Sequence, residues 1–429
     1  MDKKINNKYL LVTNRGPDFK TSKTDHEAMG GTKGIYPQIM SVFCDKWLCL
    51  MPSGKMAGSL RSEYGKDLEV LSIKDSRYDD YYYKYVSETL YPYLLGYKNE
   101  AKKHPRAYRD YVIDMLADKI NEDFESKPVI ICDYHLYDLP RKIKSDVSKL
   151  FFWFVPILTI EHYDDNFKEI LRDLNYATEI YFFDDVWANN FINCFNHFLP
   201  GEKMKVKVKS LLMGPDEFYA EDDNYSLDDY KNLMKEIFNK NISVGRNILS
   251  VSRMDFVKRI PLLIEGFEKY LEIYNDTVST LTIIAPHHRK ESDVYKNENE
   301  LIVNLVNNSA YKDRIFLSSE NLSSNKLKVL YKYAEMFVCP SLYDAMPLTP
   351  LEYISANIGT GRTVISNSLG SYRFLSTLTF TFEANDSHSL AYAINEAFVS
   401  KYNNIATMKS VVKSSTAQKA IRRLYASKI

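Results

Sequence analysis

The chain has 429 residues, too many for one compact core, and its 45% hydrophobic and 26% charged content is typical of globular domains, so we expect two of them. Lys and Arg number 56, as do Asp and Glu, so no basic excess favours nucleic acid or an anionic membrane as a partner. No apolar run approaches the roughly 20 residues of a membrane span, and residues 1–8 lack the apolar core of a signal peptide.

Strands and helices alternate along the first half of the sequence. Apolar runs rich in β-branched residues predict buried strands, and apolar residues at helical spacing predict helices. On this basis strands are expected at residues 9–13, 47–51, 68–73, 128–132, 151–157 and 178–183. Helices are expected at residues 35–43, 108–121 and 186–198.

The same alternation continues after a polar segment at residues 221–229, which marks a change of domain. Strands are expected at residues 247–252, 280–285, 315–317, 336–339 and 363–365. Helices are expected at residues 230–239, from 261, at 348–356 and from 387. The pattern predicts an α/β protein with two Rossmann-like doubly wound domains that face a central cleft.

The five cysteines include no C-x-x-C pair, and their odd number does not fit a closed set of disulfides. Most lie in apolar runs, as buried free thiols do. Because free thiols persist in a reducing compartment, we expect a cytoplasmic protein.

Arg253 and Lys258 lie on the loop that leaves the predicted strand 247–252, and open α/β sheets bind their ligands at such carboxyl ends. Pro261 follows at a first helical position. Two permanent cations beside a helix N-terminus predict a phosphate or diphosphate site. A solvated Arg and Lys on a surface loop would give the same pattern, so the loop alone leaves both interpretations open.

Other polar groups also follow predicted strands. Arg15 comes after strand 9–13, and Asp133 and His135 come after strand 128–132. The glycines of residues 30–34 would let backbone N–H groups approach an anion closely. A plain tight turn explains these glycines equally well, and capping of the next helix explains Asp133 equally well.

Seven short motifs therefore follow one another in the sequence. They are Asn14-Arg15, Gly30-Gly31, Tyr82 with Tyr91-Pro92, Asp133-Tyr134-His135-Leu136, Arg253-x-Asp255-x-x-Lys258, Ala285-Pro286-x-x-Arg289 and Asp344-x-Met346-x-Leu348-x-x-x-Glu352-Tyr353. In this order and spacing the chain resembles the trehalose-6-phosphate synthases, which are retaining glycosyltransferases of the two-domain GT-B fold. The resemblance runs from Thr13 to at least Ser371.

The resemblance implies a role for each matching position. Arg253 and Lys258 resemble the pair that grips the nucleotide-sugar diphosphate, Glu352 the carboxylate on the donor ribose, and Asp133 the group that faces the acceptor hydroxyls. The catalytic residues implied are Arg253, Lys258 and Asp133. The donor-binding residues implied are Gly31, Arg253, Lys258, Asp344, Met346, Leu348 and Glu352. The acceptor-binding residues implied are Arg15, Tyr82, Tyr91, Asp133, His135 and Arg289.

The implied reaction is a retaining, metal-independent transfer from a nucleotide sugar to a phosphorylated acceptor. The simplest version uses UDP-, GDP- or ADP-glucose and glucose 6-phosphate and gives trehalose 6-phosphate. Negative charge builds on the departing diphosphate, and fixed cations stabilise it more than the ground state. No cofactor and no metal are expected, and the partners are small molecules rather than nucleic acid or membrane. Whether the chain forms a homo-oligomer stays open.

The resemblance also divides the chain. Residues 1–240 are expected to form the N-terminal acceptor-binding domain, and residues 241–405 the C-terminal nucleotide-sugar-binding domain. Residues 406–429 are expected to form a C-terminal helix that crosses back to the first domain.

Three positions depart from the family pattern. Phe154 stands where a His contacting the donor sugar is expected, and an unpaired sugar hydroxyl would cost on the order of 1–3 kcal/mol. Either the donor sugar differs there, or another side chain such as His162 compensates. Tyr91 replaces a Trp, and Ala345-Met346-Pro347 replaces Gly-Met-Asn. All three concern sugar recognition rather than phosphate binding.

Other readings stay open. A related family member would use another substrate pair, as a glucosylglycerol-phosphate synthase or a C–N-forming pseudo-glycosyltransferase does. A non-catalytic sensor would bind nucleotide sugar or sugar phosphate without turnover. A metal-dependent GT-A transferase would use Asp184-Asp185, but this pair fits a cap of helix 186–198 better. His287-His288 shows no third metal ligand.

Overall fold

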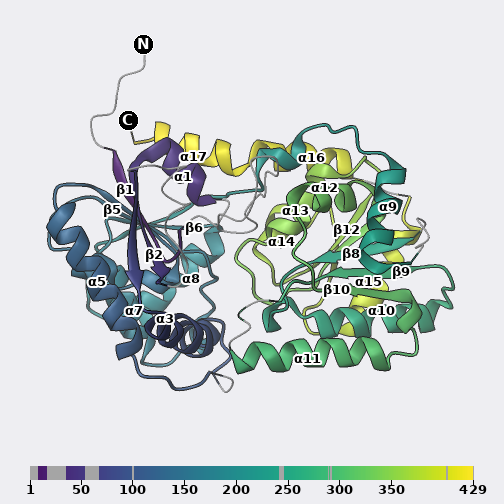
Figure 1. The fold of residues 1–429 in the computed structure, drawn as a ribbon, viewed down its shortest axis with the longest axis horizontal. Helices are drawn as coiled ribbons and strands as arrows, with labels where there is room; N and C mark the ends of the chain where they lie inside the picture. The colour runs from purple at the N-terminus through teal and green to yellow at the C-terminus, as the bar shows by residue number, and fades with distance from the viewer. Residues whose placement is uncertain are drawn as a thin grey trace, which may run out of the picture. The chain divides into compact units, whose positions relative to one another are not determined.

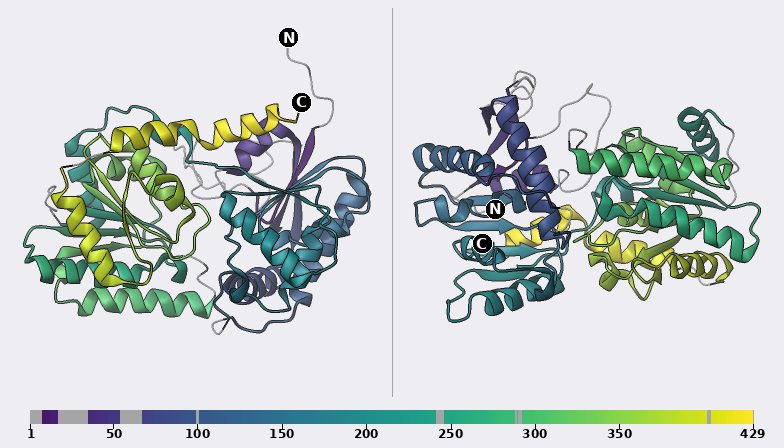
Figure 2. Two further views of the ribbon diagram at one scale, coloured as in Figure 1. Left: turned by 180° about the vertical axis from the view of Figure 1, so that it is seen from behind. Right: turned by 90° about the horizontal axis from the view of Figure 1, so that it is seen from below.

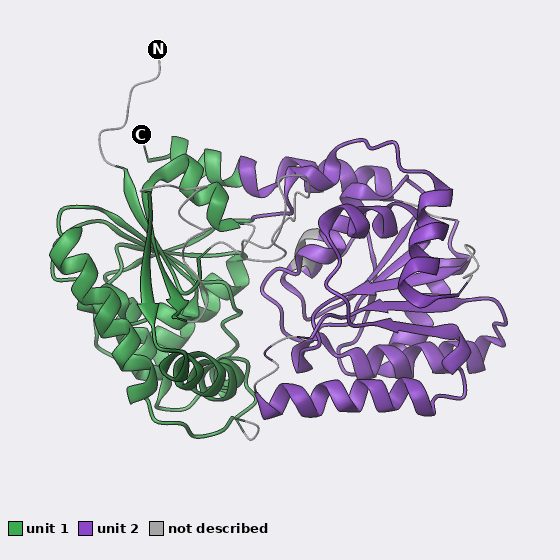
Figure 3. Cartoon of the chain, in the orientation of Figure 1, with its two compact units in different colours: residues 1–21, 32–212, 420–429 green, residues 22–31, 213–419 purple. Residues whose placement is uncertain are grey.

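The computed structural model describes residues 8–16, 35–53, 67–98, 101–240, 246–287, 289, 292–401 and 404–428, with the backbone alone at residues 371, 373 and 374. These residues form two α/β units (Figure 3). Unit 1 comprises the described residues up to Leu212 and those from Ala420 onward, and unit 2 comprises those of Met213–Lys419.

Unit 1 is built on a seven-stranded sheet with the order β3-β2-β1-β4-β5-β6-β7, in which each strand pairs in parallel with its neighbours. Figure 1 labels β1, β2, β5 and β6 of this sheet. The strands are β1 (Tyr9–Thr13), β2 (Cys44–Pro52), β3 (Leu68–Ile73), β4 (Val129–Cys132), β5 (Lys149–Phe152), β6 (Glu179–Phe182) and β7 (Lys207–Ser210). The strands β4 and β6 are buried along their whole length because helices cover both faces of the sheet (Figure 2).

The helices of unit 1 include an unusual element. They are α1 (Ile35–Phe43), α3 (Asp75–Tyr78), α4 (Tyr91–Leu94), α5 (Ala107–Asp123), α6 (Leu139–Lys142), α7 (Phe167–Leu174) and α8 (Asp185–Phe198). Between α3 and α4 the aromatic stretch forms a twelve-residue π-helix, Asp79–Leu90. Because π-helices are rare and gather at functional sites, this segment is a candidate part of one. Short 3₁₀ turns occupy Tyr134–Leu136 and Ile160–His162.

Unit 2 contains a six-stranded parallel sheet with the order β10-β9-β8-β11-β12-β13. The strands are β8 (Asn247–Val251), β9 (Thr280–Ile284), β10 (Ile315–Ser318), β11 (Met336–Cys339), β12 (Arg362–Ser366) and β13 (Phe380–Phe382). The helices are α9 (Leu227–Phe238), α10 (Ile260–Tyr274), α11 (Asp293–Asn308), α12 (Ser324–Tyr333), α13 (Leu348–Ala356), α14 (Gly370–Leu375), α15 (Ser387–Val399), α16 (Ile405–Ser414) and α17 (Ala417–Ala426), and the last of these continues into unit 1. Short 3₁₀ turns occupy Glu217–Ala220, Phe256–Lys258 and Lys312–Arg314.

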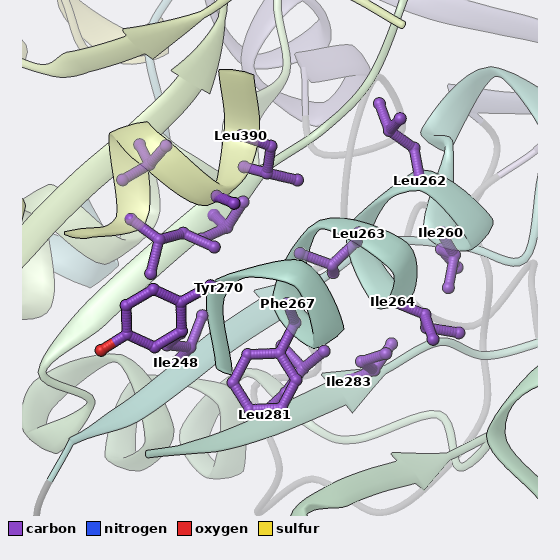
Figure 4. Packing of buried hydrophobic residues seen from close by; sticks show 14 of the residues in the cluster. Ile248, Ile260, Leu262, Leu263, Ile264, Phe267, Tyr270, Leu281, Ile283 and Leu390 are labelled. Carbon is purple, nitrogen blue, oxygen red and sulfur yellow. The ribbon is translucent and has the colours of Figure 1, made fainter. Parts of the chain in front are cut away.

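The core of unit 2 lies between its sheet and the helices α10 and α15. Leu263 and Phe267 of α10 pack with Ile248 of β8, Leu281 of β9 and Leu390 of α15, and all five are almost fully buried (Figure 4). Leu263 and Phe267 are one helical turn apart in the sequence, so they lie on the same apolar face of α10.

In both sheets the strand order reverses beside the first strand of the unit. The first strand of unit 1, β1, pairs with β2 and β4, and the first strand of unit 2, β8, pairs with β9 and β11. Connections leave on opposite sides at such a point and open a crevice at the carboxyl ends of the two strands, where α/β sheets bind ligands. The loops after β1, β4, β8 and β11 are therefore the places for a site.

Most of the predicted elements are confirmed, and one strand was predicted too long. The strand expected at residues 151–157 ends at Phe152, so Phe154 lies on the loop beyond it. Asp184 accepts a hydrogen bond from the N–H of Val186 at 2.7 Å and caps α8 as expected. All five cysteines are free and buried.

The unit boundary also falls earlier than residue 240. Residues 213–240 belong to unit 2 because several of them bond to α12. The Nζ of Lys328 donates to Phe218 O at 2.6 Å, and the hydroxyl of Tyr333 donates to Tyr225 O at 2.6 Å. No helix of the described residues is long and apolar enough to cross a bilayer.

Candidate functional site

At the strand-order reversal of unit 1, Arg15 lies directly after β1 against two tyrosines. Its Nε donates to the hydroxyl of Tyr78 at 2.9 Å, and its guanidinium carbon lies 3.9 Å from the centroid of the Tyr82 ring. The Tyr78 and Tyr82 rings are stacked with centroids 5.6 Å apart. Tyr82 comes from the π-helix and Tyr78 from the helix just before it, so this region of the chain orients the guanidinium.

The same aromatic stack continues to the loop after β4. The Tyr82 ring stacks on the imidazole of His135 at 5.9 Å, and that imidazole stacks on Tyr134 at 4.1 Å. Tyr134 in turn stacks on Tyr91 at 5.7 Å. The fold thus gathers a set that we call the Arg15 cluster: Arg15, Tyr82, Tyr91, Asp133 and His135.

Asp133 occupies a strained backbone conformation at the start of this loop. Its φ is 83°, a region that costs a non-glycine residue of order 1–3 kcal/mol and is common at functional sites. One carboxylate oxygen accepts a hydrogen bond from the N–H of Tyr134 at 2.9 Å, and the other lies 3.3 Å from Nδ1 of His135. Asp133 therefore caps the 3₁₀ turn and also lies beside His135, so the capping role does not exclude a second role.

In unit 2, the loops after β8 and β11 are tied together at the strand-order reversal. Lys258 forms an ion pair with Asp344, and Val257 O accepts a hydrogen bond from Leu342 N at 2.9 Å. Lys258 and Asp344 are mostly buried, with side chains 14% and 17% exposed. We call Arg253, Lys258, Asp344 and Glu352 the Lys258 cluster.

Arg253 is the exposed cation of this loop. Its side chain is 46% exposed, and its Nη2 lies 3.5 Å from Oδ2 of the fully buried Asp255. Asp255 also accepts a hydrogen bond from Val257 N at 3.3 Å and so begins the 3₁₀ turn that contains Lys258. The aspartate of the motif thereby orients both cations.

Glu352 lies buried inside α13. It accepts a hydrogen bond from the hydroxyl of Tyr331 at 3.1 Å. Burial raises the pKa of Glu352 to about 7, since desolvation outweighs the hydrogen bond from Tyr331, and the charge of Asp216 adds to the rise. Tyr331 follows a helical apolar pattern in the sequence, so no local signal marked it as a partner.

Met346 and Leu348 flank the start of α13. Met346 is buried, and Leu348 is the first helical residue and half-buried. The N-cap residue Pro347 provides no side-chain hydrogen bond to the helix. The first N–H groups of α13 therefore lack a side-chain cap and are suited to bind an anion or hydroxyl.

One predicted acceptor-binding residue, Arg289, does not belong to unit 1. Arg289 belongs to unit 2, has a φ of 51°, and is buried with its Nη1 donating to the hydroxyl of Tyr295 at 2.5 Å. Its loop lies beside the cation loop, because Met254 and His287 form a parallel bridge. Gly31 lies outside the described residues.

Phe154 is packed into an aromatic group. Its ring stacks on Phe183 at 5.1 Å and lies 6.2 Å from the ring of Tyr36. His162 contacts other residues: its Nδ1 lies 3.1 Å from the hydroxyl of Thr159, and its ring lies beside the turn at Gly96. The structure therefore gives no support to compensation of Phe154 by His162.

Among the described residues, no group of three or more His, Cys, Asp or Glu side chains is arranged to hold a metal ion. Tyr78 is a contact of Arg15 that the motifs missed. Tyr78 lies just before the tyrosine run, but the sequence does not show that its side chain turns toward Arg15, which is 63 residues away.

The comparisons with known proteins agree on one family. The family model described as glycosyltransferase family 20 matches residues 51–425. The α,α-trehalose-phosphate synthase (UDP-forming) of Encephalitozoon cuniculi is 25% identical over 398 residues, which cover 85% of this chain and 84% of the relative. A probable synthase of the same type from Arabidopsis thaliana is 25% identical over 381 residues, and this chain spans only 48% of its length.

Solved structures share the fold at lower identity. A structure from E. coli bound with UDP-2-fluoro glucose has a TM-score of 0.83 at 18% identity, with 98% of both chains covered. A UDP-forming synthase from Burkholderia xenovorans in complex with glucose-6-phosphate has a TM-score of 0.79 at 16% identity, with 98% of this chain and 99% of the other covered. The predicted α/β fold class is confirmed.

Proposed function

This chain belongs to glycosyltransferase family 20, and we propose that it is a trehalose-6-phosphate synthase-like glycosyltransferase that moves a sugar from a nucleotide sugar to a sugar phosphate. The simplest pair is UDP-glucose and glucose 6-phosphate, which gives trehalose 6-phosphate. The observation that carries the proposal is at the strand-order reversal of unit 2, where Lys258 pairs with Asp344 and Arg253 lies beside Asp255.

On the donor side, Arg253 and Lys258 bind the diphosphate of the nucleotide sugar. Negative charge grows on this group as the glycosidic bond breaks, so cations fixed by Asp255 and Asp344 stabilise the transition state more than the ground state. These cations supply the charge for which other transferases use a metal. Glu352 accepts hydrogen bonds from the ribose hydroxyls.

The same loop ends bind the donor sugar. Asp344, already paired with Lys258, accepts hydrogen bonds from the sugar hydroxyls. The backbone N–H groups of Met346 and Leu348, at the uncapped start of α13, donate hydrogen bonds to the donor sugar. Gly31 is also a proposed donor-binding residue.

On the acceptor side, Arg15 and Tyr82 bind the phosphate of the sugar phosphate, and Arg289 contributes from unit 2. Asp133 and His135 bind the acceptor hydroxyls, and Tyr91 packs on the sugar. Arg15 suits the phosphate because its planar guanidinium presents several fixed donors.

Configuration is retained by a front-face reaction. The acceptor hydroxyl attacks from the side on which the diphosphate leaves, and the departing phosphate oxygen takes its proton. The new glycosidic bond forms as the old bond breaks, so no protein nucleophile is needed. The protein contributes by holding both substrates in position and by stabilising charge.

A second substrate pair is favoured by one observation. Phe154 packs against Phe183 and Tyr36 and offers no hydrogen bond at the position where a hydrogen-bonding side chain would recognise glucose. A donor sugar without a hydroxyl at that position, or another acceptor such as glycerol 3-phosphate, fits this surface.

The test incubates the purified chain with UDP-, GDP- or ADP-glucose and with glucose 6-phosphate or glycerol 3-phosphate, and measures nucleoside diphosphate release and product mass. We expect release with at least one pair. Binding of donor without release with any pair would support a non-catalytic sensor and contradict the proposal.

The variant Arg253→Ala tests the assigned donor role. We expect kcat/KM for the donor to fall about 10²–10³-fold, because one stabilising group of the transition state is lost. Lys296→Ala, which removes an exposed cation of α11, is the matched control and should keep full activity. Full activity in Arg253→Ala would contradict the mechanism.

A further inference from the structure

A fully buried arginine lies behind the Arg15 cluster. Arg109 of α5 and Asp138 at the end of the loop after β4 are both 0% exposed and form an ion pair with Nη2 and Oδ1 2.5 Å apart. A buried ion pair stabilises a fold less than apolar residues of the same volume do, so its presence calls for another explanation.

Arg109 contacts this one loop at three successive points. Its Nε donates to the backbone carbonyl of His135 at 2.9 Å, and its guanidinium carbon lies 3.8 Å from the ring centroid of Tyr137. With the ion pair to Asp138, one side chain holds residues 135, 137 and 138.

The loop needs such support because of how it begins. Asp133 has a φ of 83°, a conformation that persists only when the surroundings over-determine it. The carbonyl that Arg109 binds belongs to His135, whose imidazole lies between the rings of Tyr82 and Tyr134. A shift of this carbonyl would move the imidazole within the stack and change its 3.3 Å approach to Asp133.

We propose that Arg109 is a positioning residue for acceptor binding: its hydrogen bond to His135 O and its ion pair with Asp138 hold Asp133 and His135 in the geometry that the acceptor requires. The inference rests on the proposed function, in which Asp133 and His135 bind the acceptor. Arg109 itself touches no substrate, because its side chain is fully buried.

Three variants separate positioning from simple stability. Arg109→Met removes the fork and leaves Asp138 in the interior with only the 3.8 Å approach of Arg106 Nη2 to its Oδ2. Arg109→Met with Asp138→Leu removes both charges and restores an apolar interior, so its stability should recover. Arg109→Lys keeps the positive charge but lacks the guanidinium fork, so it can donate to only some of the groups that Arg109 binds. Glu179→Gln is the control, since it breaks the ion pairs with Lys209 and Lys428. These pairs lie at the amino end of β6, whereas the loop after β4 lies at the carboxyl ends of the strands.

We expect Arg109→Met and the double variant to raise KM for glucose 6-phosphate about tenfold or more, and to leave KM for UDP-glucose within about twofold. Arg109→Lys should recover part of the loss. Glu179→Gln should lose thermal stability and keep both KM values. A double variant with recovered stability and the KM of the wild type for glucose 6-phosphate would overturn the proposal, as would an equal rise of both KM values.

Hydrogen–deuterium exchange provides a readout that needs no substrate. The amides of residues 133–138 should exchange faster in Arg109→Met and in the double variant, and at the normal rate in Glu179→Gln. A wild-type chain that releases no nucleoside diphosphate would refute the proposed function, whereas unchanged exchange at residues 133–138 would refute the role of Arg109.

Discussion

Glu352 shows how one buried group links stability to pH. An ordinary glutamate titrates near 4.5, and burial raises the pKa of Glu352 to about 7. The folded protein therefore keeps this proton in a pH range where the unfolded chain has released it. The contribution of Glu352 to stability falls as pH rises from about 4.5 to about 7, and is constant above that range.

We predict that Glu352→Gln removes this dependence. Glutamine stays neutral and keeps an oxygen for Tyr331, so the variant should gain stability relative to the wild type between pH 4.5 and pH 7, by on the order of 3 kcal/mol at most. Urea unfolding at several pH values measures the difference. Glu396→Gln, which changes an exposed glutamate of α15, should show no such gain. Parallel stability curves for the wild type and Glu352→Gln would contradict the prediction.

At the scale of elements, the close approach of α10 and α15 depends on one glycine. A Cβ at Gly266 of α10 would lie 2.6 Å from Cδ2 and 2.8 Å from Cγ of Leu390 on α15. Leu390 is fully buried in the hydrophobic cluster and lies beside α10 (Figure 4), so it has little room to yield. The core of unit 2 behind the Lys258 cluster therefore relies on a missing side chain.

We predict that Gly266→Ala lowers the free energy of unfolding by up to about 2 kcal/mol, because overpacking costs about 1–3 kcal/mol and the gain in helix propensity is about 1 kcal/mol. Denaturant unfolding measures the change. In a Leu390→Ala background the contacts with Cδ2 and Cγ are absent and only the 3.1 Å approach to Cβ of residue 390 remains, so the same substitution should cost much less. A stabilising effect in the otherwise unchanged chain would show that the two helices move apart at no cost.

At the scale of the whole molecule, the end of the chain belongs to the unit in which the chain begins. Residues from Ala420 onward are part of unit 1, where Tyr425 packs edge-on against Phe43 with centroids 5.2 Å apart and Lys428 pairs with Glu179. Ile421 is fully buried. Unit 1 is thus completed by residues that follow unit 2 in sequence.

We predict that Ile421→Ala destabilises unit 1 by about 2–4 kcal/mol, which is the usual cost of this truncation in a core. Hydrogen exchange should become faster in β1 and β6 and stay unchanged in β8 and β9. Ile405→Ala, made at a buried residue of α16 in unit 2, is the matched control and should have the opposite pattern. Faster exchange confined to unit 2 in Ile421→Ala would contradict the division.

The sequence by itself determined the two doubly wound sheets and the loops that carry the Arg15 and Lys258 clusters. The physical reason is that apolar runs and strand-end polar residues are local signals, and parallel strands bring their carboxyl ends to one edge. The early end of β5, the π-helix and the place of residues 213–240 were decided by tertiary packing. Tertiary packing also decided the pairing of Lys258 with Asp344, 86 residues apart, and the contact of Arg109 with His135, 26 residues apart. Such partners meet only after the chain folds, and burial rather than local pattern selects them.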